Sequence, residues 1–157
     1  MKMIPTIISR RPFTAENDLA GIVVLSASSE FKPGDRVFGY LHSDIQRMIR
    51  QGALNQYTRL PASSIAPLPS NISFTQGSGF ALAGVTALQA LVDCGNVQEG
   101  QSVFINGGSS SVGAFAIQIA KAKGCKVVAS ASGGNEELVR GLGADDVGHL
   151  PFLGSSN

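Results

Sequence analysis

Cysteine is scarce in this chain of 157 residues, which contains only Cys94 and Cys125. Two cysteines cannot form a structural zinc site of the four-cysteine type, and neither one has a cysteine or histidine partner at the spacing of metal ligands. Both lie among apolar residues. We therefore expect two buried free thiols in a reducing compartment.

An excess of charge of either sign is also missing, because 12 lysines and arginines oppose 11 acidic residues and leave a net charge of +1. We find no basic stripe, which argues against nucleic acid or an anionic membrane as a partner. No apolar run reaches the ~18 residues of a membrane span. The opening "MKMIPTIISRRPF" is basic, but its apolar part is too short for a secretory signal. A mitochondrial presequence is an alternative, and the cytoplasm is the default location.

Apolar residues make up 43% of the chain and there are 19 glycines, which is typical of a soluble globular protein with many tight turns. The pattern of the sequence changes near "PLPSNISF", where Pro67 and Pro69 interrupt any regular element. We therefore predict two domains, over residues 1–72 and 73–157.

The first domain is predicted to consist of short strands and turns. Strands are expected over 20–25 and, after the turn signal Pro33-Gly34-Asp35, over 36–38. Residues 52–60 alternate partly and are rich in strand formers towards their end, while 41–51 are either helix or loop. The pattern indicates an irregular β-rich unit.

The second domain is predicted to alternate helix and strand. Ser73 is an expected helix N-cap, and the glycines after it predict close packing or a break near Gly84. Strands are expected over 103–106 and 126–131, a short helix over 136–144, and a third strand from 145. Between the first two strands, one helical face carries Val112, Phe115, Ala116, Ile119 and Ala120, and Gly124 ends that helix. This order predicts a parallel sheet with right-handed connections.

The turn between strand 103–106 and the following helix is rich in glycine. Gly107 and Gly108 can make a sharp turn, and Gly113 allows the helix to pack closely on the strand. Ser110 stands in the middle position, where glycine is usual, and its hydroxyl could bond a phosphate oxygen. A helix N-terminus in this setting favours a pyrophosphate, so we predict dinucleotide binding rather than a purely structural turn. No Gly-Lys-Ser/Thr follows, which argues against a Walker-type phosphate loop.

The end of strand 126–131 should select the cofactor, because NAD sites place an acidic residue there. Residues 130–135 contain no acid, and Ser132 and Asn135 could donate hydrogen bonds to a 2′-phosphate. Against this, no arginine or lysine is adjacent, and Glu136 and Glu137 follow. The sequence favours NADP over NAD.

Six motifs occur in the order "NDLAG", "FKPGDRVFG", "GALNQY", "LAGVTALQAL", "VFINGGSSSVGAFAIQIAKAKGCKVVA" and "GLGADDV". With these motifs the chain resembles the medium-chain dehydrogenase/reductase superfamily over about residues 12–147, specifically its zinc-independent quinone oxidoreductase and enoyl reductase branch. The resemblance implies an α/β fold, with a partial GroES-like catalytic domain followed by the first half of a Rossmann-type parallel sheet. It also implies metal-free reduction of a quinone or enone by NADPH.

Carried over position by position, the resemblance implies a cofactor site. The pyrophosphate turn matches Gly107, Ser110, Ser111, Val112 and Gly113. The nicotinamide end matches Thr86, and the adenosine-phosphate edge matches Ser132 and Asn135. Metal-dependent relatives carry Gly-His-Glu where this chain has Glu16, Asn17 and Asp18, so no metal site is expected.

The residues do not identify a catalytic proton donor, which stays unknown. His42, His149, Tyr40 and Tyr57 are the titratable candidates, and for each a structural or surface role is favoured. Tyr40 also loosely matches a position near the cofactor. Asp35 and the pair Asp145-Asp146 are interpreted as turn residues.

Both ends of the chain depart from the family pattern, before Pro12 and after "GADDV". We therefore expect a truncated chain with two or three strands of the parallel sheet. Exposed sheet edges would favour a homo-oligomer. The alternative to an enzyme is a non-catalytic fragment that retains at most nucleotide or protein binding.

Overall fold

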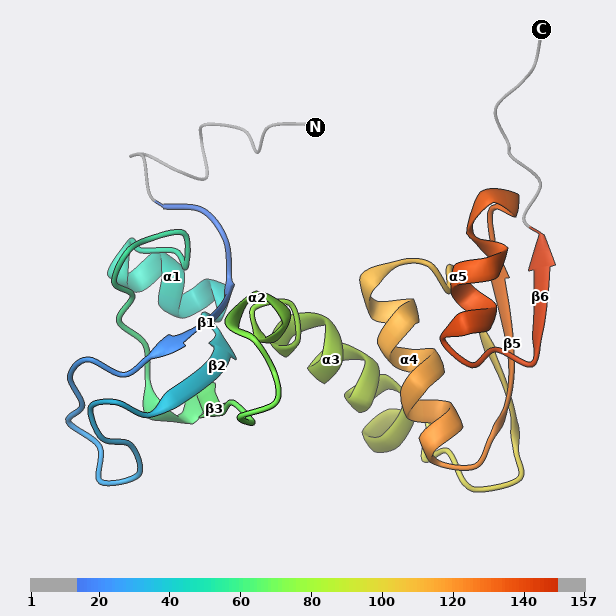
Figure 1. Ribbon diagram of the computed structural model, residues 1–157, viewed down its shortest axis with the longest axis horizontal. Helices are drawn as coiled ribbons and strands as arrows, with labels where there is room; N and C mark the ends of the chain where they lie inside the picture. The colour runs from blue at the N-terminus through green and yellow to red at the C-terminus, as the bar shows by residue number, and fades with distance from the viewer. Residues whose placement is uncertain (1–13, 150–157) are drawn as a thin grey trace, which may run out of the picture. The chain divides into compact units, whose positions relative to one another are not determined.

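The computed structural model describes residues 14–149, which form two compact units. The first unit ends at Leu82 and contains an antiparallel sheet, and the second begins at Ala83 and contains a parallel sheet (Figure 1). This confirms the predicted α/β class. The chain passes from one unit to the other within a helix, later in the sequence than the predicted boundary between residues 72 and 73.

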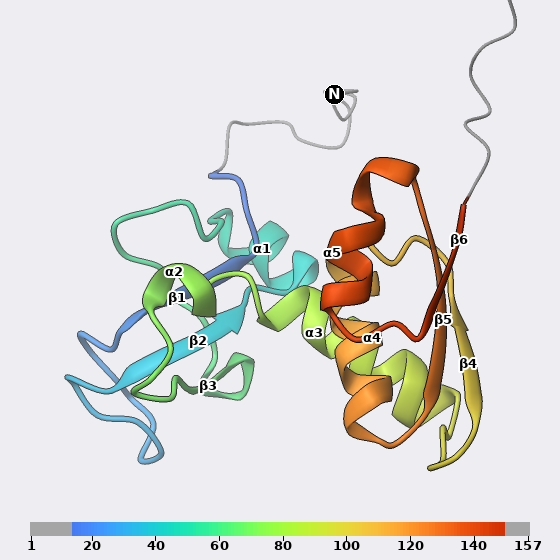
Figure 2. The same ribbon diagram turned by 45° about the vertical axis from the view of Figure 1, so that its right-hand side comes forward.

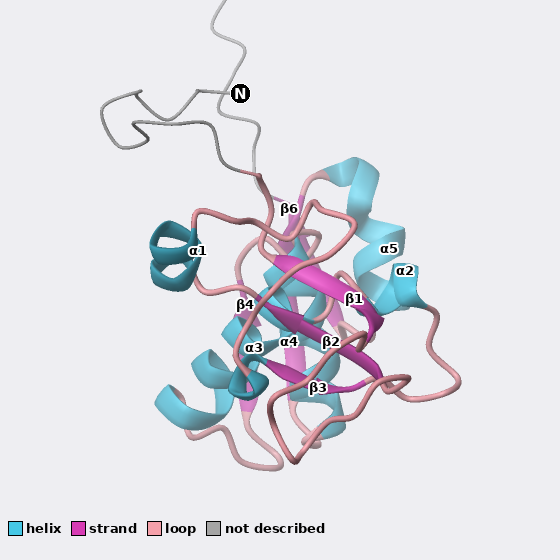
Figure 3. Cartoon of the chain, turned by 90° about the vertical axis from the view of Figure 1, so that its left-hand side faces the viewer, coloured by secondary structure: helices cyan, strands magenta, loops and turns pink. Residues whose placement is uncertain are grey.

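The first sheet has the order β1-β2-β3, with β1 at Asp18–Ile22, β2 at Arg36–Tyr40 and β3 at Ile65–Pro67 (Figure 3). Its strands are antiparallel, and Asp18 lies opposite Tyr40. The predicted strand 20–25 is therefore shifted. It ends at Ile22, because the N–H of Asp35 donates to the carbonyl of Lys32 in the turn before β2, and the carbonyl of Val23 accepts from the N–H of Gly34 instead.

Helix α1 spans Ser43–Ile49. Residues 41–51, for which the sequence allowed either a helix or a loop, therefore contain a helix. The strand-like reading of residues 52–60 is wrong, because this segment is a loop. The side chain of Gln51 supplies the reason. Its amide donates to the carbonyl of Tyr57 at 2.8 Å and accepts from the backbone N–H of Arg59 at 3.3 Å, which folds the segment back on itself.

A 3-10 turn at Ala62–Ser64 leads into β3, and helix α2 at Phe74–Gly77 begins at the predicted cap, Ser73. Ser73 and Gln76 form a capping box. Helix α3 spans Ala81–Leu88 and continues as a π-helical turn over Gln89–Cys94. The chain breaks between α2 and α3 rather than at Gly84. Gly84 lies within α3, where a Cβ would make ordinary van der Waals contact with the ring of Phe115 at 3.8 Å, so the predicted close packing does not require a glycine here.

The second sheet has the order β4-β5-β6 and is parallel throughout. Its elements are β4 (Ser102–Ile105), α4 (Ser111–Ala122), β5 (Lys126–Ala131), a 3-10 turn (Gly133–Asn135), α5 (Glu136–Gly141) and β6 (Asp146–His149). Figure 2 shows α4 and α5 on the same face of this sheet. Gly124 follows α4 with a positive φ of 76°, as expected for a glycine that ends a helix.

The core of the second unit lies between the sheet and these helices, with Ile117, Val127 and Val139 fully buried. The predicted face of α4 is confirmed except at its first position, because Val112 is exposed. Cys125 is buried as predicted, but Cys94 is exposed. Cys94 is the last residue of the π-helical turn, and its apolar neighbours in sequence do not cover it.

Apolar side chains are left uncovered on the edge strand β4. Phe104 is 65% exposed, while its neighbour Ile105 is buried, because successive residues of a strand point to opposite faces. Within residues 14–149, no helix is long and apolar enough to cross a membrane.

Candidate cofactor site

The glycine turn lies between the end of β4 and the start of α4. Gly107 adopts a positive φ of 70°, a conformation that glycine reaches without steric cost. Its carbonyl accepts a hydrogen bond from the backbone N–H of Ser110 at 2.9 Å, which closes the turn. The sequence has glycine where the backbone requires it.

Gly113 allows the closest approach in this region. A Cβ at this position would lie 2.3 Å from the carbonyl oxygen of Gly107 and 2.9 Å from the Cα of Gly108. Real Cβ atoms do not come so close to backbone, so α4 can start beside the turn only with glycine here. The packing role predicted for Gly113 is therefore confirmed.

Ser130 of β5 holds the turn from the neighbouring strand. Its hydroxyl accepts from the N–H of Gly107 at 3.0 Å and donates to the side-chain oxygen of Asn106 at 2.7 Å. Its carbonyl accepts from the N–H of Gly108 at 2.8 Å. Ser130 is only 3% exposed. Sequence reasoning missed this role, although a serine in the otherwise apolar "KVVASA" is a signal that could have indicated it.

Helix α4 presents free backbone donors at its N-terminus. Ser110 is the N-cap, and its hydroxyl accepts from the N–H of Gly113 at 3.1 Å while its own hydrogen remains available to donate. Among the described residues, the N–H groups of Ser111 and Val112 have no hydrogen-bond acceptor, and both residues are exposed. The positive end of the helix dipole adds to these donors. Together they form a seat suited to an anion such as a pyrophosphate.

Ser132 and Asn135 lie at the same end of the sheet as this turn, because β4 and β5 are parallel neighbours. They flank the 3-10 turn after β5, where the Asn135 side-chain amide donates to the Ser132 hydroxyl at 2.8 Å. The structure thus brings seven of the eight predicted cofactor residues to one end of the sheet. Thr86, the eighth, lies on α3 as an exposed residue.

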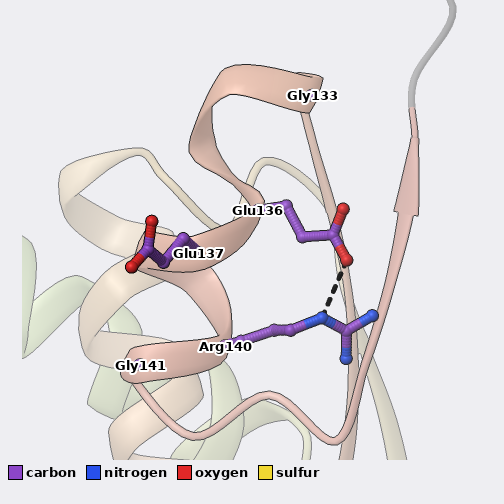
Figure 4. A pocket seen from close by; sticks show the side chains of 5 residues that line it. All are labelled: Gly133, Glu136, Glu137, Arg140 and Gly141. Carbon is purple, nitrogen blue, oxygen red and sulfur yellow. Dashed lines mark hydrogen bonds and ion pairs between the residues drawn. The ribbon is translucent and has the colours of Figure 1, made fainter.

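A shallow, open depression of about 600 Å³ borders Gly133, and its charged lining does not suit a phosphate. It is lined by one side of α5, with Glu136, Glu137 and Arg140 as its charged residues (Figure 4). The Arg140 guanidinium bonds the Glu136 carboxylate at 2.8 Å and lies 3.7 Å from Asp146. Arg140 is therefore already neutralised, and the negative residues disfavour a phosphate in this depression.

The predicted proton-donor candidates include residues with local structural roles. His42 is the N-cap of α1, where its Nδ1 accepts from the N–H of Asp44 at 3.3 Å, and its ring packs edge-on against Tyr40 at 6.4 Å between centroids. Tyr57 is 65% exposed in its loop. The side chain of His149 lies outside the described residues. The catalytic residue therefore stays unassigned.

The acidic residues interpreted as turn residues do bond turn backbone. Asp35 accepts from the N–H of Lys32 at 2.8 Å. Asp145 accepts from the N–H of Val127 at 2.6 Å and from the Lys121 ammonium at 2.9 Å. The hydrogen bond from Lys121 and that from Val127 lower the pKa of Asp145 below its usual value.

The segment that replaces the metal-binding motif is engaged in backbone hydrogen bonds. The Asn17 side chain donates to the carbonyl of Leu41 at 2.6 Å, and Asp18 accepts from the N–H of Leu82 at 2.8 Å. Between residues 14 and 149, no group of three or more histidine, cysteine or acidic side chains is placed to hold a metal ion.

No family model matches the chain. Among curated proteins, it is 38% identical over 143 residues to the trans-enoyl reductase pgmF of Aspergillus terreus, which covers 87% of this chain and 39% of that protein. It is 37% identical over 141 residues to the quinone oxidoreductase of Mus musculus, covering 87% of this chain and 40% of that protein. The chain spans about two fifths of the length of these relatives.

Solved structures match the fold. A mycobacterial protein complexed with NADPH matches with a TM-score of 0.78 at 25% identity, over 94% of this chain and 44% of that one. An NAD-dependent alcohol dehydrogenase matches with a TM-score of 0.76 at 28% identity, over 88% of this chain and 47% of that one. These matches confirm the resemblance to quinone oxidoreductases and enoyl reductases, and with it the partial GroES-like and Rossmann-type fold class.

Proposed function

We propose that this chain, a homologue of parts of trans-enoyl reductases and quinone oxidoreductases, binds NADPH and belongs to an oxidoreductase of quinones or enones. One observation carries the proposal. The turn from Gly107 to Gly113 leaves two exposed backbone donors without acceptors at the positive end of a 12-residue helix. A dinucleotide pyrophosphate is the ligand that this arrangement favours within a parallel sheet.

The residues present fit a nicotinamide dinucleotide. The N–H groups of Ser111 and Val112 and the hydroxyl of Ser110 would hold the pyrophosphate, and Gly113 keeps the space beside Gly107 free of a side chain. Thr86 would serve the nicotinamide end, as the family resemblance implies. When bound, the nicotinamide supplies a hydride to an electrophilic carbon. The contribution of the protein is to bind and orient the reactants.

NADPH is proposed over NADH because the edge after β5 lacks an acid. Ser132 and Asn135 each retain a donor hydrogen beyond their mutual bond, so both could serve a 2′-phosphate. A carboxylate at this position would instead hold the ribose hydroxyls of NAD and repel that phosphate. Of the two solved neighbours, one is complexed with NADPH and the other is an NAD-dependent alcohol dehydrogenase, so the choice rests on the residues after β5.

We propose a metal-free reaction because of the residues that stand where metal-dependent relatives carry their zinc-binding motif. Asn17 and Asp18 bond the backbones of Leu41 and Leu82. Both side chains are therefore engaged in hydrogen bonds that hold the backbone. Without a metal, an oxyanion donor must stabilise the enolate that forms as an enone is reduced.

A homo-oligomer is proposed on the exposed edge of the second sheet. Phe104 is 65% exposed on β4, which pairs only with β5 among the described strands. An edge strand with an exposed aromatic side chain favours association.

Two titrations and one rate measurement test the proposed function. We expect NADPH to quench the tyrosine emission of the chain or to gain fluorescence itself, with a lower Kd than NADH. A lower Kd for NADH would contradict the cofactor choice, and no binding of either would overturn the proposal. Oxidation of NADPH in the presence of a simple quinone or enone would support catalysis by this chain. Binding without turnover would instead support the alternative of a non-catalytic nucleotide-binding fragment.

A further inference from the structure

Asn106 is a polar residue beside the glycine turn that the predicted cofactor site does not include. It directly follows β4 and directly precedes Gly107, whose positive φ starts the turn. Asn106 is exposed, whereas Ile105 before it is buried. Asn106 therefore stands at the carboxyl end of a parallel strand, the end at which such sheets bind their ligands.

A buried hydroxyl fixes the orientation of the Asn106 side chain. Ser130, which is only 3% exposed, donates to Asn106 Oδ1 at 2.7 Å and accepts from the N–H of Gly107 at 3.0 Å. A hydroxyl has one hydrogen, and within residues 14–149 the hydrogen of Ser130 has no other acceptor. An amide turned the other way would face Ser130 with its NH2 group and leave this buried hydrogen without a bond, which is unfavourable. The oxygen of Asn106 therefore faces Ser130.

The NH2 group of Asn106 lies on the branch of the amide that is not bonded to Ser130. Neither of its two hydrogens has an acceptor in the part of the chain that the structure describes. The side chain thus offers two N–H donors at the turn, held in place by a bond to a buried group. An acceptor oxygen of a ligand is the group that such donors recognise.

The order of the sheet places these donors on one side of the proposed pyrophosphate seat. Ser132 and Asn135, proposed for the 2′-phosphate, follow β5, so the adenosine half of the cofactor would lie over β5. Helices α4 and α5 cover the same face, so the connections from β4 to β6 run in one direction (Figure 2). In a doubly wound sheet the ligand crevice opens beside the first strand of such a series, where the direction reverses. Since β4 is that strand, the nicotinamide half would leave the seat past Asn106.

We propose that Asn106 is a further cofactor-binding residue, whose side-chain amide donates to an oxygen of the nicotinamide half of the dinucleotide, on its phosphate or its ribose. This inference rests on the proposed function, because it requires that the turn binds a nicotinamide dinucleotide. It also gives Ser130 a second role, since the Ser130 hydroxyl determines which end of the amide meets the ligand.

Asn106→Asp tests this donor with the smallest change of shape. A carboxylate keeps an acceptor for Ser130, but it has no hydrogen to donate and brings a negative charge towards the cofactor. The probes are NADPH and adenosine 2′,5′-bisphosphate, which carries the 2′-phosphate and one further phosphate but lacks the nicotinamide half. We expect the Kd for NADPH to rise about tenfold or more, the effect of one lost hydrogen bond to a charged group. The Kd for the bisphosphate should rise less than about threefold, because only screened repulsion acts on it.

Two further variants separate the donor from other effects. Ser102→Asp adds the same charge at the exposed first residue of β4, on the same face as Asn106 but about 13 Å away along the strand. This control should bind both probes as wild type does, since a charge at that distance is largely screened. Asn106→Ala removes the donors and also the acceptor for Ser130. It should weaken NADPH about tenfold and leave the bisphosphate within about twofold of wild type.

A purely structural role of Asn106 predicts different results. If Asn106 only held the turn, Asn106→Asp would bind NADPH as wild type does and Asn106→Ala would weaken both probes, and either result would overturn the proposal. An equal loss of both probes in Asn106→Asp, or an equal effect of Ser102→Asp, would also overturn it. Should Asn106→Asp fail to fold by circular dichroism, the loss confined to NADPH must be found with Asn106→Ala. A wild-type chain that binds neither probe would refute the proposed function itself, whereas wild-type binding with unaffected variants would refute only the role of Asn106.

Discussion

Replacing Ser111 with proline removes one backbone N–H, a proposed donor to the pyrophosphate, and so tests the seat at α4. Ser111 is the first residue of α4 after its N-cap, a position where proline is favoured and where its missing N–H breaks no helical bond. The preceding residue, Ser110, has φ −72° and ψ 161°, the extended conformation that a following proline requires. Ser111 is exposed, so no core packing is lost. Ser111→Pro therefore removes one proposed phosphate donor while leaving the fold intact.

The magnitude follows from the charge of the ligand. A hydrogen bond to a charged group contributes about 1.5–3 kcal/mol, and about 1.4 kcal/mol changes a Kd tenfold. We expect Ser111→Pro to raise the Kd for NADPH roughly 10- to 150-fold on this scale. Its stability should change by less than about 1 kcal/mol, because proline fits the backbone here.

The assay is an NADPH fluorescence titration, with thermal unfolding as the check on folding. Ser111→Ala is the matched control, since it removes the hydroxyl but keeps the backbone N–H, and it should bind NADPH as wild type does. A proline variant that folds and binds NADPH with unchanged affinity would refute the seat at α4.

Three further changes probe the scaffold of the site. Ser130→Ala leaves the N–H of Gly107 and the side chain of Asn106 without their buried partner, and should lower the free energy of unfolding by about 1–3 kcal/mol in urea titrations; an unchanged midpoint would count against this role. Gly113→Ala places a Cβ against the carbonyl of Gly107 and should cost about 1–3 kcal/mol in the same assay, whereas Gly133→Ala, where a Cβ meets nothing within 4 Å, should cost much less. The pKa of Asp145 is lowered in the folded chain, so its stabilising effect is complete above the ordinary value of 3.8 and is lost as the pH falls through the lower folded value. Asp145→Asn should remove that loss from a plot of unfolding midpoint against pH, and an unaltered plot would show that the carboxylate does not contribute.

The parallel sheet was predictable because its signals are local. The apolar period of α4, the short apolar strands and the glycines at 107, 113 and 124 each occur within a few residues of the structure they determine. The glycine turn and its two neighbouring edges therefore follow from the sequence, although cofactor binding at them stays a prediction.

The features that sequence reasoning missed depend on distant or side-chain contacts. The loop at 52–60 is folded by the side chain of Gln51, which overrides the strand preference of its residues. Cys94 is exposed at the end of a π-helical turn, although its neighbours in sequence are apolar. The contacts of Ser130 with the turn and of Asp18 with Leu82 cross between elements. The serine in the apolar "KVVASA" could indicate the first contact but not its partner, and no local pattern in the sequence indicates the second.

The proposed anion seat at α4 has two main-chain donors beside the Ser110 hydroxyl, and this determines which experiments can detect it. Every substitution except proline preserves the N–H of Ser111 and Val112, so we expect alanine at 111 or 112 to leave the NADPH affinity in place, whereas Ser110→Ala would remove the proposed hydroxyl donor and the N-cap. The same property allows the side chains at these positions to vary among functional sequences. The proposed recognition would depend mainly on the path of the backbone, which the neighbouring glycines determine.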